Sequence, residues 1–294
     1  MRIRCAVPEF RPTLGPLWGK LLLAALATLL LASVASAQSS TPDPATPRAI
    51  ESQVAGIRGL KPLAEPELQL LDRTSLNTYL TDEFNRNYLP SERESDQKEL
   101  VALGLIQPTD NLVQLELNLL SDQVIGIYDP DARSLFVVND QADFGPAARI
   151  TYAHEFNHAL QDEYYGLNKI APKHPDSNDR SLAVHGLIEG DAIMLQTLWA
   201  SRNLTEDDMA QLATDSAGAD TGLADAPMIL RAELLFPYTE GYSFVRQMYR
   251  QAGNSYAAID AIFANPPEST AQLLHPDKYR KHVSPAAATI ASGA

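Results

Sequence analysis

The stretch Pro146-Ala-Ala-Arg-Ile-Thr-Tyr-Ala-His-Glu-Phe-Asn-His-Ala-Leu-Gln-Asp-Glu-Tyr-Tyr-Gly166 predicts one long helix. Proline suits the first position of a helix and glycine suits the residue that follows its end. His154 and His158 are four residues apart, so their side chains lie one above the other on the same face. Apolar residues flank both histidines, so we expect a buried helix, in which two unpaired imidazoles would be costly.

Glu155 follows the first of these histidines. The H-E-x-x-H spacing lets both imidazoles bind one zinc ion while the glutamate reaches a water on that ion without being a ligand. Zinc lowers the pKa of such a water to roughly 7. The carboxylate can accept its proton and later deliver it to a leaving amine. The motif therefore predicts a Zn²⁺ hydrolase with Glu155 as its general base.

A catalytic zinc site usually has three protein ligands and one open position. Glu189 is the best third candidate, because it belongs to a second predicted helix that runs from about Arg180 to Ser201. The loop before that helix is long enough to bring the two helices together. Gly190 would let the second helix pack closely against the first.

Two other residues compete with Glu189 for the third position. His185 is one turn earlier on the same helix face. Asp162 continues the stripe of His154 and His158, but it lies a full turn beyond the second histidine. Asp191 and Asp162 are also candidates to accept hydrogen bonds from the outer nitrogens of the histidines, since bound imidazoles usually donate there.

Two β-rich runs, Gln123–Tyr128 and Ser134–Val138, flank the turn-forming cluster Asp129–Arg133 and predict a β-hairpin. Most of the other periodic segments are helical in pattern. They are 71–89, 92–105, 111–120 and several stretches between 227 and 263. The expected fold is therefore α+β and mostly helical, with a small sheet beside the histidine helix.

The first 37 residues resemble a secretory signal peptide. Basic residues precede the apolar run Leu21–Ala32, and Ala35-Ser-Ala37 is a suitable cleavage site. The run is shorter than the roughly 20 residues of a membrane-spanning helix, so an uncleaved anchor is the less favoured alternative. We therefore expect a secreted, periplasmic or cell-envelope protein with no stable membrane insertion after cleavage.

The expected organisation has four parts. They are a signal peptide (1–37), a flexible linker (38–49), one domain (50–282, with a helical part 50–120 and a catalytic core 121–282) and a disordered tail (283–294). Residues 50–120 could alternatively form a pro-segment that covers the cleft, but the helical half of the domain is the preferred interpretation.

The mature chain would be strongly acidic. Of 23 Lys+Arg and 37 Asp+Glu, the leader takes four and one, which leaves 19 and 36 and a net charge of −17. Such a surface repels nucleic-acid phosphates and anionic lipid headgroups. The single cysteine, Cys5, leaves with the leader, so the mature chain has no disulfide.

The histidine helix followed by a glutamate helix resembles the gluzincin branch of the zincin metallopeptidases. A resemblance over most of the mature chain is to a largely uncharacterised family of exported bacterial HExxH proteins. The segments that carry it are 57–60, 103–105, 126–130, 154–162, 189–192, 237–241 and 267–279. These resemblances imply a zincin-like domain that acts on a peptide or protein substrate. One departure is that Glu-Gly-Asp-Ala192 replaces the thermolysin pattern around the third ligand, so outer-sphere roles cannot be transferred.

An edge strand of a zincin pairs with extended peptide, and either predicted strand could be that edge. A further donor should stabilise the oxyanion. We favour Tyr238 or Tyr242 for this role over His275 and Tyr279. The alternative functions are a non-catalytic zinc-binding pseudo-peptidase that binds a peptide or cell-envelope partner, and a structural domain that binds no metal.

Overall fold

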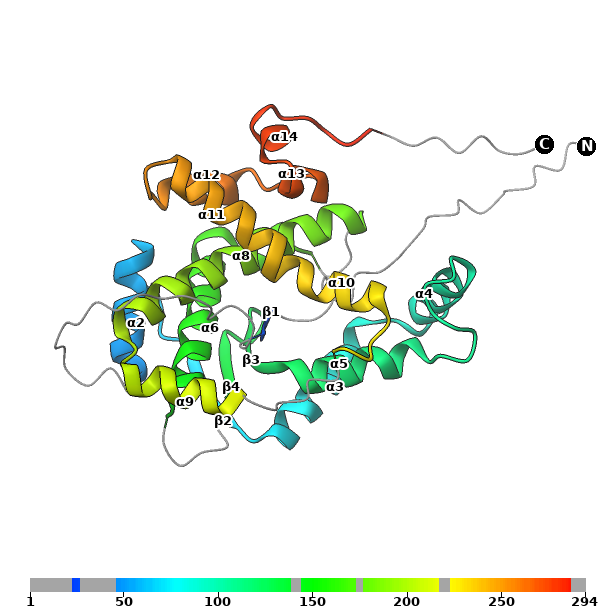
Figure 1. Cartoon of the computed structure of the whole chain (residues 1–294), viewed down its shortest axis with the longest axis horizontal. Helices are drawn as coiled ribbons and strands as arrows, with labels where there is room; N and C mark the ends of the chain where they lie inside the picture. The colour runs from blue at the N-terminus through cyan, green and yellow to red at the C-terminus, as the bar shows by residue number, and fades with distance from the viewer. Residues whose placement is uncertain (1–22, 27–45, 139–143, 173–176, 217–222, 287–294) are drawn as a thin grey trace, which may run out of the picture.

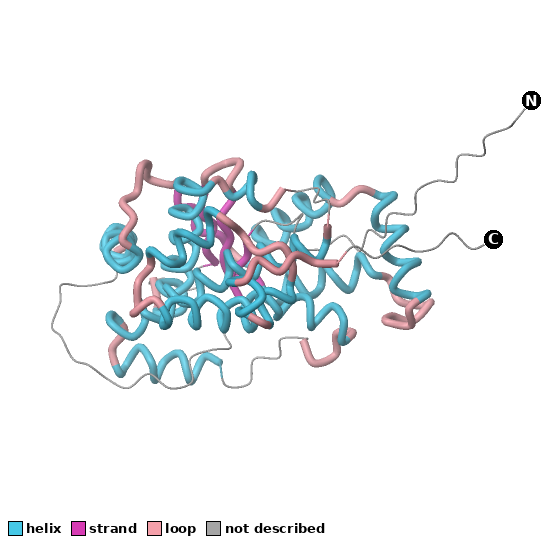
Figure 2. Tube along the Cα trace, turned by 90° about the horizontal axis from the view of Figure 1, so that it is seen from above, coloured by secondary structure: helices cyan, strands magenta, loops and turns pink. Residues whose placement is uncertain are grey.

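The structure is a computed structural model, and it describes residues 23–26, 46–138, 144–172, 177–216 and 223–286. Helices pack against both faces of a small sheet (Figures 1 and 2). The expected α+β, mostly helical class is therefore confirmed. The predicted leader, linker and tail lie largely outside the described residues.

Four strands form the sheet, in the order β1-β3-β4-β2. Their bounds are β1 Leu23–Leu26, β2 Glu67–Leu71, β3 Val124–Asp129 and β4 Ser134–Val138. β3 and β4 form the predicted antiparallel hairpin. The Asp129 carboxylate closes its turn by accepting hydrogen bonds from the backbone N–H groups of the two residues after Pro130.

Two of the strands differ from the expectation. β2 pairs in parallel with β4, and the helix that was expected from Leu71 begins only at Arg73, with the Asp72 side chain as its N-cap. β1 lies within the predicted leader and pairs antiparallel with β3. Strands whose partners are far away in the sequence leave no local signal.

The helices have the following bounds: α2 Pro47–Arg58, α3 Arg73–Asn87, α4 Pro90–Ala102, α5 Leu112–Gln123, α6 Pro146–Tyr165, α7 Leu167–Ile170, α8 Asn178–Asn203, α9 Glu206–Ser216, α10 Met228–Phe236, α11 Tyr242–Gln251, α12 Ala257–Ala264, α13 Thr270–Leu274 and α14 Pro276–Arg280. A π-helical segment, η1, covers Pro237–Gly241. α2 begins inside the predicted linker, because Thr46 caps it and Pro47 occupies its first turn.

The sheet separates two hydrophobic cores. Leu135 and Val137 face the core built around α6 and α8, whereas Phe136 and Ile127 face the core built by α3, α4, α5 and α10. This division follows from the alternation of side chains along a strand. Helices α3, α4 and α5 therefore cover one face of the sheet, whereas Ile50 and Val54 of α2 belong to the core on the other face.

α6 lies against β3 and β4 and packs on α2 and α8. In Figure 1 it stands behind α8 at the centre of the molecule, with α2 beside it. Because neighbours surround α6, most of its side chains from Pro146 to Gln161 are buried. The two helices that carry the predicted metal ligands are thus in direct contact.

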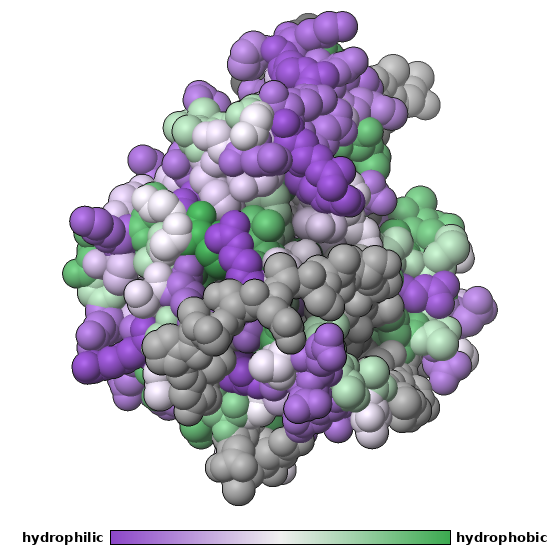
Figure 3. Space-filling view, turned by 60° about the vertical axis from the view of Figure 1, so that its left-hand side comes forward, coloured by the Kyte–Doolittle hydropathy of each residue, from purple (hydrophilic) through white to green (hydrophobic). Residues whose placement is uncertain are grey.

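The described helices include none with the length and apolar character needed to cross a bilayer. On the face drawn in Figure 3, hydrophilic residues gather over the C-terminal helices at the top of the view. Hydrophobic residues occur there in smaller groups among polar ones.

Candidate metal centre

α6 holds His154, Glu155 and His158 in the interior, and none of the three side chains is exposed to solvent. The ring centroids of the two histidines lie 4.7 Å apart. Their Nε2 atoms are 3.0 Å apart, a contact that the i,i+4 spacing on one helix face allows.

α8 brings Glu189 to these rings. Its Oε2 atom lies 3.2 Å from Nε2 of His154 and 3.4 Å from Nε2 of His158. One ligand atom from each of the three residues lies within 4.8 Å of the others. Among the described residues this is the single group of three His, Cys, Asp or Glu side chains close enough to hold a metal ion.

The two competing candidates lie outside this group. His185 is buried on α8, and its Nδ1 donates to the carbonyl of Ser181, one turn earlier. Asp162 accepts hydrogen bonds from the Tyr128 hydroxyl and the Leu167 N–H, so it secures the C-terminal end of α6. Glu189 is therefore the residue that the structure brings to the histidines.

The outer nitrogens of the histidines face two glutamines. Nδ1 of His154 lies 2.9 Å from Oε1 of Gln196, and Nδ1 of His158 lies 2.8 Å from Oε1 of Gln161. The expectation that Asp191 or Asp162 accepts these bonds is therefore wrong. The helical spacing could have identified both glutamines as neighbours of the site. Gln161 is one turn after His158, and Gln196 is two turns after Glu189.

These contacts determine which ring nitrogens are bare. An amide oxygen can only accept a hydrogen bond, so each Nδ1 carries a hydrogen, and each ring presents a lone pair at Nε2 whenever that ring is neutral. Two imidazole lone pairs and a carboxylate oxygen therefore meet at one point in the interior. This arrangement is repulsive unless a positive charge lies among the three groups, and the donor set suits Zn²⁺.

The close contact of the two histidines with Glu189 also shifts the pKa values of these residues. Burial alone would raise the pKa of Glu189, but the positive charge of His158 and hydrogen bonds from both histidines lower it to about 2. Burial opposes charge on His158, yet the carboxylates of Glu189 and Glu155 raise its pKa to about 9. Burial lowers the pKa of His154. Without a metal ion, a proton on His158 supplies the charge that the cluster needs.

Glu155 lies directly under strand β3. A Cβ atom on Gly126 would lie 3.1 Å from Oε1 of Glu155 and 2.3 Å from Cγ2 of Thr151. Only glycine leaves room for this close approach of the strand to α6. The backbone of β3 is thus held next to the predicted general base.

Tyr238 reaches the cluster from the π-helical segment η1. It is buried, and its hydroxyl hydrogen-bonds Glu189. Burial, followed by the charges of Glu189 and Glu155, raises its pKa well above the usual value, so it stays a neutral donor. η1 touches α8 backbone to backbone, since a Cβ atom on Gly190 would lie 2.4 Å from the Gly241 carbonyl.

The other predicted donors are placed elsewhere. The Tyr242 ring lies 5.8 Å from the Arg246 guanidinium and packs at the junction of the two cores. His275 is exposed, and the Tyr279 hydroxyl donates to the carbonyl of Asn265. The structure therefore brings Tyr238 alone of these four residues into hydrogen-bond contact with a predicted ligand.

Comparison of the chain with protein-family models, with curated proteins and with solved structures gave no match.

Proposed function

We propose that this protein is a zinc-dependent metallopeptidase of the zincin type, with zinc held by His154, His158 and Glu189. The observation that carries the proposal is the convergence of three buried lone-pair donors beside a fourth side chain, Glu155, that can accept a proton. Zinc held by two imidazoles and a carboxylate acidifies a bound water and polarises a substrate carbonyl.

The chain's own residues supply the other parts of the reaction. Glu155 accepts the proton of the attacking water and delivers it to the amine that leaves. Tyr238 donates a hydrogen bond to the carbonyl oxygen as negative charge develops on it. Gln161 and Gln196 hold the two imidazoles so that both Nε2 atoms face Glu189.

The arrangement of the sheet supports a peptide as the substrate. Of the two predicted strands, β4 is internal, between β3 and β2, whereas the other side of β3 pairs with β1, which belongs to the predicted leader. In the structure β1 occupies that edge, antiparallel, with Leu23 opposite Tyr128 and Leu26 opposite Val124. If the predicted leader is removed, an extended substrate can pair there in the same direction. It would then pass next to Gly126, under which Glu155 lies.

The test is to measure bound zinc and cleavage of an unfolded protein for the mature chain. Glu155→Gln should keep its zinc and lose cleavage, because the amide cannot accept the proton. Glu189→Ala should lose most of its zinc. Glu163→Gln, further along α6, is the matched control and should retain both, since Glu163 binds the backbone N–H groups of Leu63 and Ala64.

Three outcomes discriminate the alternatives. Zinc without cleavage of any peptide tested would favour the pseudo-peptidase. A protein that binds no zinc would refute both zinc-dependent functions. Full zinc in Glu189→Ala would move the third ligand elsewhere, first to His185.

A further inference from the structure

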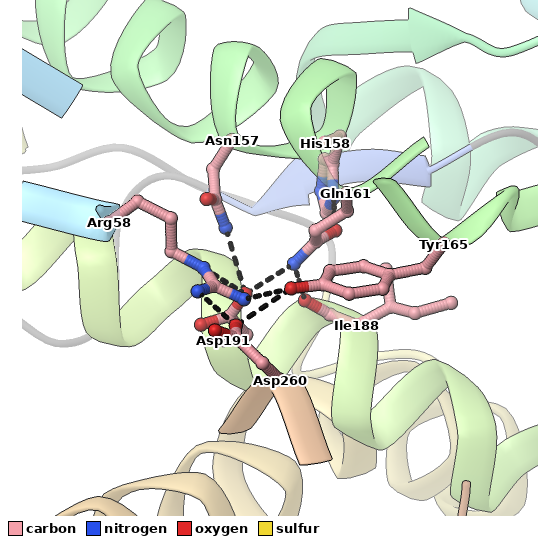
Figure 4. A network of polar contacts seen from close by, with 8 residues as sticks. All are labelled: Arg58, Asn157, His158, Gln161, Tyr165, Ile188, Asp191 and Asp260. Carbon is pink, nitrogen blue, oxygen red and sulfur yellow. Dashed lines mark hydrogen bonds and ion pairs between the residues drawn. The ribbon is translucent and has the colours of Figure 1, made fainter. Parts of the chain in front are cut away.

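A buried polar network lies behind the predicted ligand His158 (Figure 4). Its centre is an ion pair between Arg58, the last residue of α2, and Asp191 of α8, with Nε 3.2 Å from Oδ2. Both side chains are fully shielded from solvent, although the two residues are 133 positions apart in the sequence. Arg58 also contacts Asp260 of α12 at 2.6 Å.

The same Asp191 oxygen accepts hydrogen bonds from α6. Nδ2 of Asn157 lies 3.3 Å from it, and Nε2 of Gln161 lies 2.8 Å from it. Nε2 of Gln161 also donates to the carbonyl of Ile188, at 3.0 Å. Figure 4 shows these groups converging from α2 and α6 on one carboxylate of α8.

This pattern determines how the Gln161 amide is oriented. Its two N–H hydrogens are committed to two acceptors, so its oxygen must face Nδ1 of His158, 2.8 Å away. If the amide were reversed, its oxygen would face two other acceptors, the Asp191 carboxylate and the Ile188 carbonyl. Its N–H groups would then face the Nδ1–H of His158, so neither side could form a hydrogen bond. Asp191 therefore sets the direction of the bond that His158 donates.

The ion pair is hard to explain by stability alone. Two charges lose their hydration on burial, and well-packed apolar residues often stabilise a fold as well or better. The pair is better explained if the negative charge of Asp191 is needed next to Gln161. Arg58 balances the carboxylate, and the carboxylate orients the amide that holds the imidazole.

We propose that Arg58 and Asp191 are positioning residues of the metal centre, which act on His158 through Gln161. The proposal rests on the metal site proposed above. It also makes α2 an integral part of that site, because removal of α2 would leave Asp191 charged in the interior without its cation. The proposal therefore predicts that α2 remains part of the domain and is not removed as a pro-segment.

The test compares zinc affinity, measured by competition with a chromophoric chelator, in two variants of the network. Gln161→Met removes the acceptor of His158 while it keeps an unbranched side chain of similar length. Asp191→Asn keeps the shape but removes the charge that faces Arg58. Both should bind zinc roughly 10- to 100-fold more weakly than the wild type, the usual effect of losing an outer-sphere partner.

A partly buried ion pair on the same helix provides the control. Arg149, in the first turn of α6, pairs with Asp208 of α9, and no contact of either residue with His154 or His158 is found among the described residues. Asp208→Asn therefore removes the charge from an ion pair on α6 that lies away from the histidines. It should lower the thermal stability of the metal-free protein but leave zinc affinity within about threefold of the wild-type value.

The absorption spectrum of the cobalt-substituted protein gives a readout independent of affinity. Gln161→Met should shift the ligand-field bands, because the His158 ring is no longer held, whereas Asp208→Asn should leave them unchanged. Wild-type zinc affinity in Gln161→Met would overturn the proposal even if Asp191→Asn does not fold. A wild-type protein without zinc affinity would instead refute the proposed metal site itself.

Discussion

The close approach of β3 to α6 gives a sharp prediction for Gly126→Ala. The added methyl group would lie 2.3 Å from Cγ2 of Thr151, and 3.1 Å and 3.2 Å from Oε1 and Cγ of Glu155. A contact of 2.3 Å cannot persist, so the strand and the helix must separate or Thr151 must move. Overpacking of a buried site costs about 1–3 kcal/mol in the free energy of unfolding.

The displaced Glu155 carboxylate should also lower catalysis. A shift of about 1 Å in a reacting group can cost about 10²-fold in rate. Gly126 does not contact the predicted ligands, so zinc content should not change. The assays are urea unfolding of the metal-free protein, bound zinc per chain and kcat on an unfolded protein.

The double variant Gly126→Ala, Thr151→Ser separates the two effects. Serine lacks Cγ2 but keeps the hydroxyl that donates to the carbonyl of Ala147. Stability should therefore recover, while kcat stays low because the contact with Glu155 remains. Thr151→Ser alone is the control. Wild-type stability and kcat in Gly126→Ala would refute the inferred packing of β3 on the general base.

Three further predictions follow from the pKa shifts and the site. Tyr238→Phe should lower kcat by about 10²–10³-fold and retain its zinc. Tyr242→Phe is the control and should remain active. Equal rates in the two variants would exclude Tyr238 as the oxyanion donor. Zinc should displace the proton of His158, whose pKa is about 9. Zinc affinity, measured by titration, should therefore rise about tenfold per pH unit from pH 6 to 8. A zinc affinity that does not change with pH would contradict this prediction. Burial and the charge of Asp96 raise the pKa of Glu233 from 4.5 to about 7. Its stabilising contribution of about 3 kcal/mol is therefore complete below pH 4.5 and lost as pH rises to 7, and Glu233→Gln should remove this part of the pH dependence in urea titrations.

The sequence predicted the parts of the fold that have local signals. The hairpin followed from the turn at Asp129–Arg133, and α6 followed from its flanking proline and glycine. β2 was not predicted, because its partner β4 is far along the chain and its residues read as the approach to a helix. The Arg58–Asp191 pair was missed for the same reason.

In the candidate site too, the sequence predicted the features that have a local signal and missed the others. The i,i+4 spacing predicts that His154 and His158 share one helix face, and the structure brings Glu189 to them from α8. Periodicity could not distinguish carboxylates from glutamines as outer partners, since both occupy suitable helix positions. Tyr238 lies on the π-helical segment η1, whose Gly241 packs against Gly190 of α8, and this contact between distant segments leaves no periodic pattern in the sequence.

The most direct test of the metal centre is a crystal structure of the zinc-loaded mature protein with anomalous data at the zinc edge. We expect one strong anomalous peak, about 2.0–2.2 Å from Nε2 of His154, Nε2 of His158 and a carboxylate oxygen of Glu189. A peak that contacts other side chains, or no peak where these three residues meet, would contradict the account.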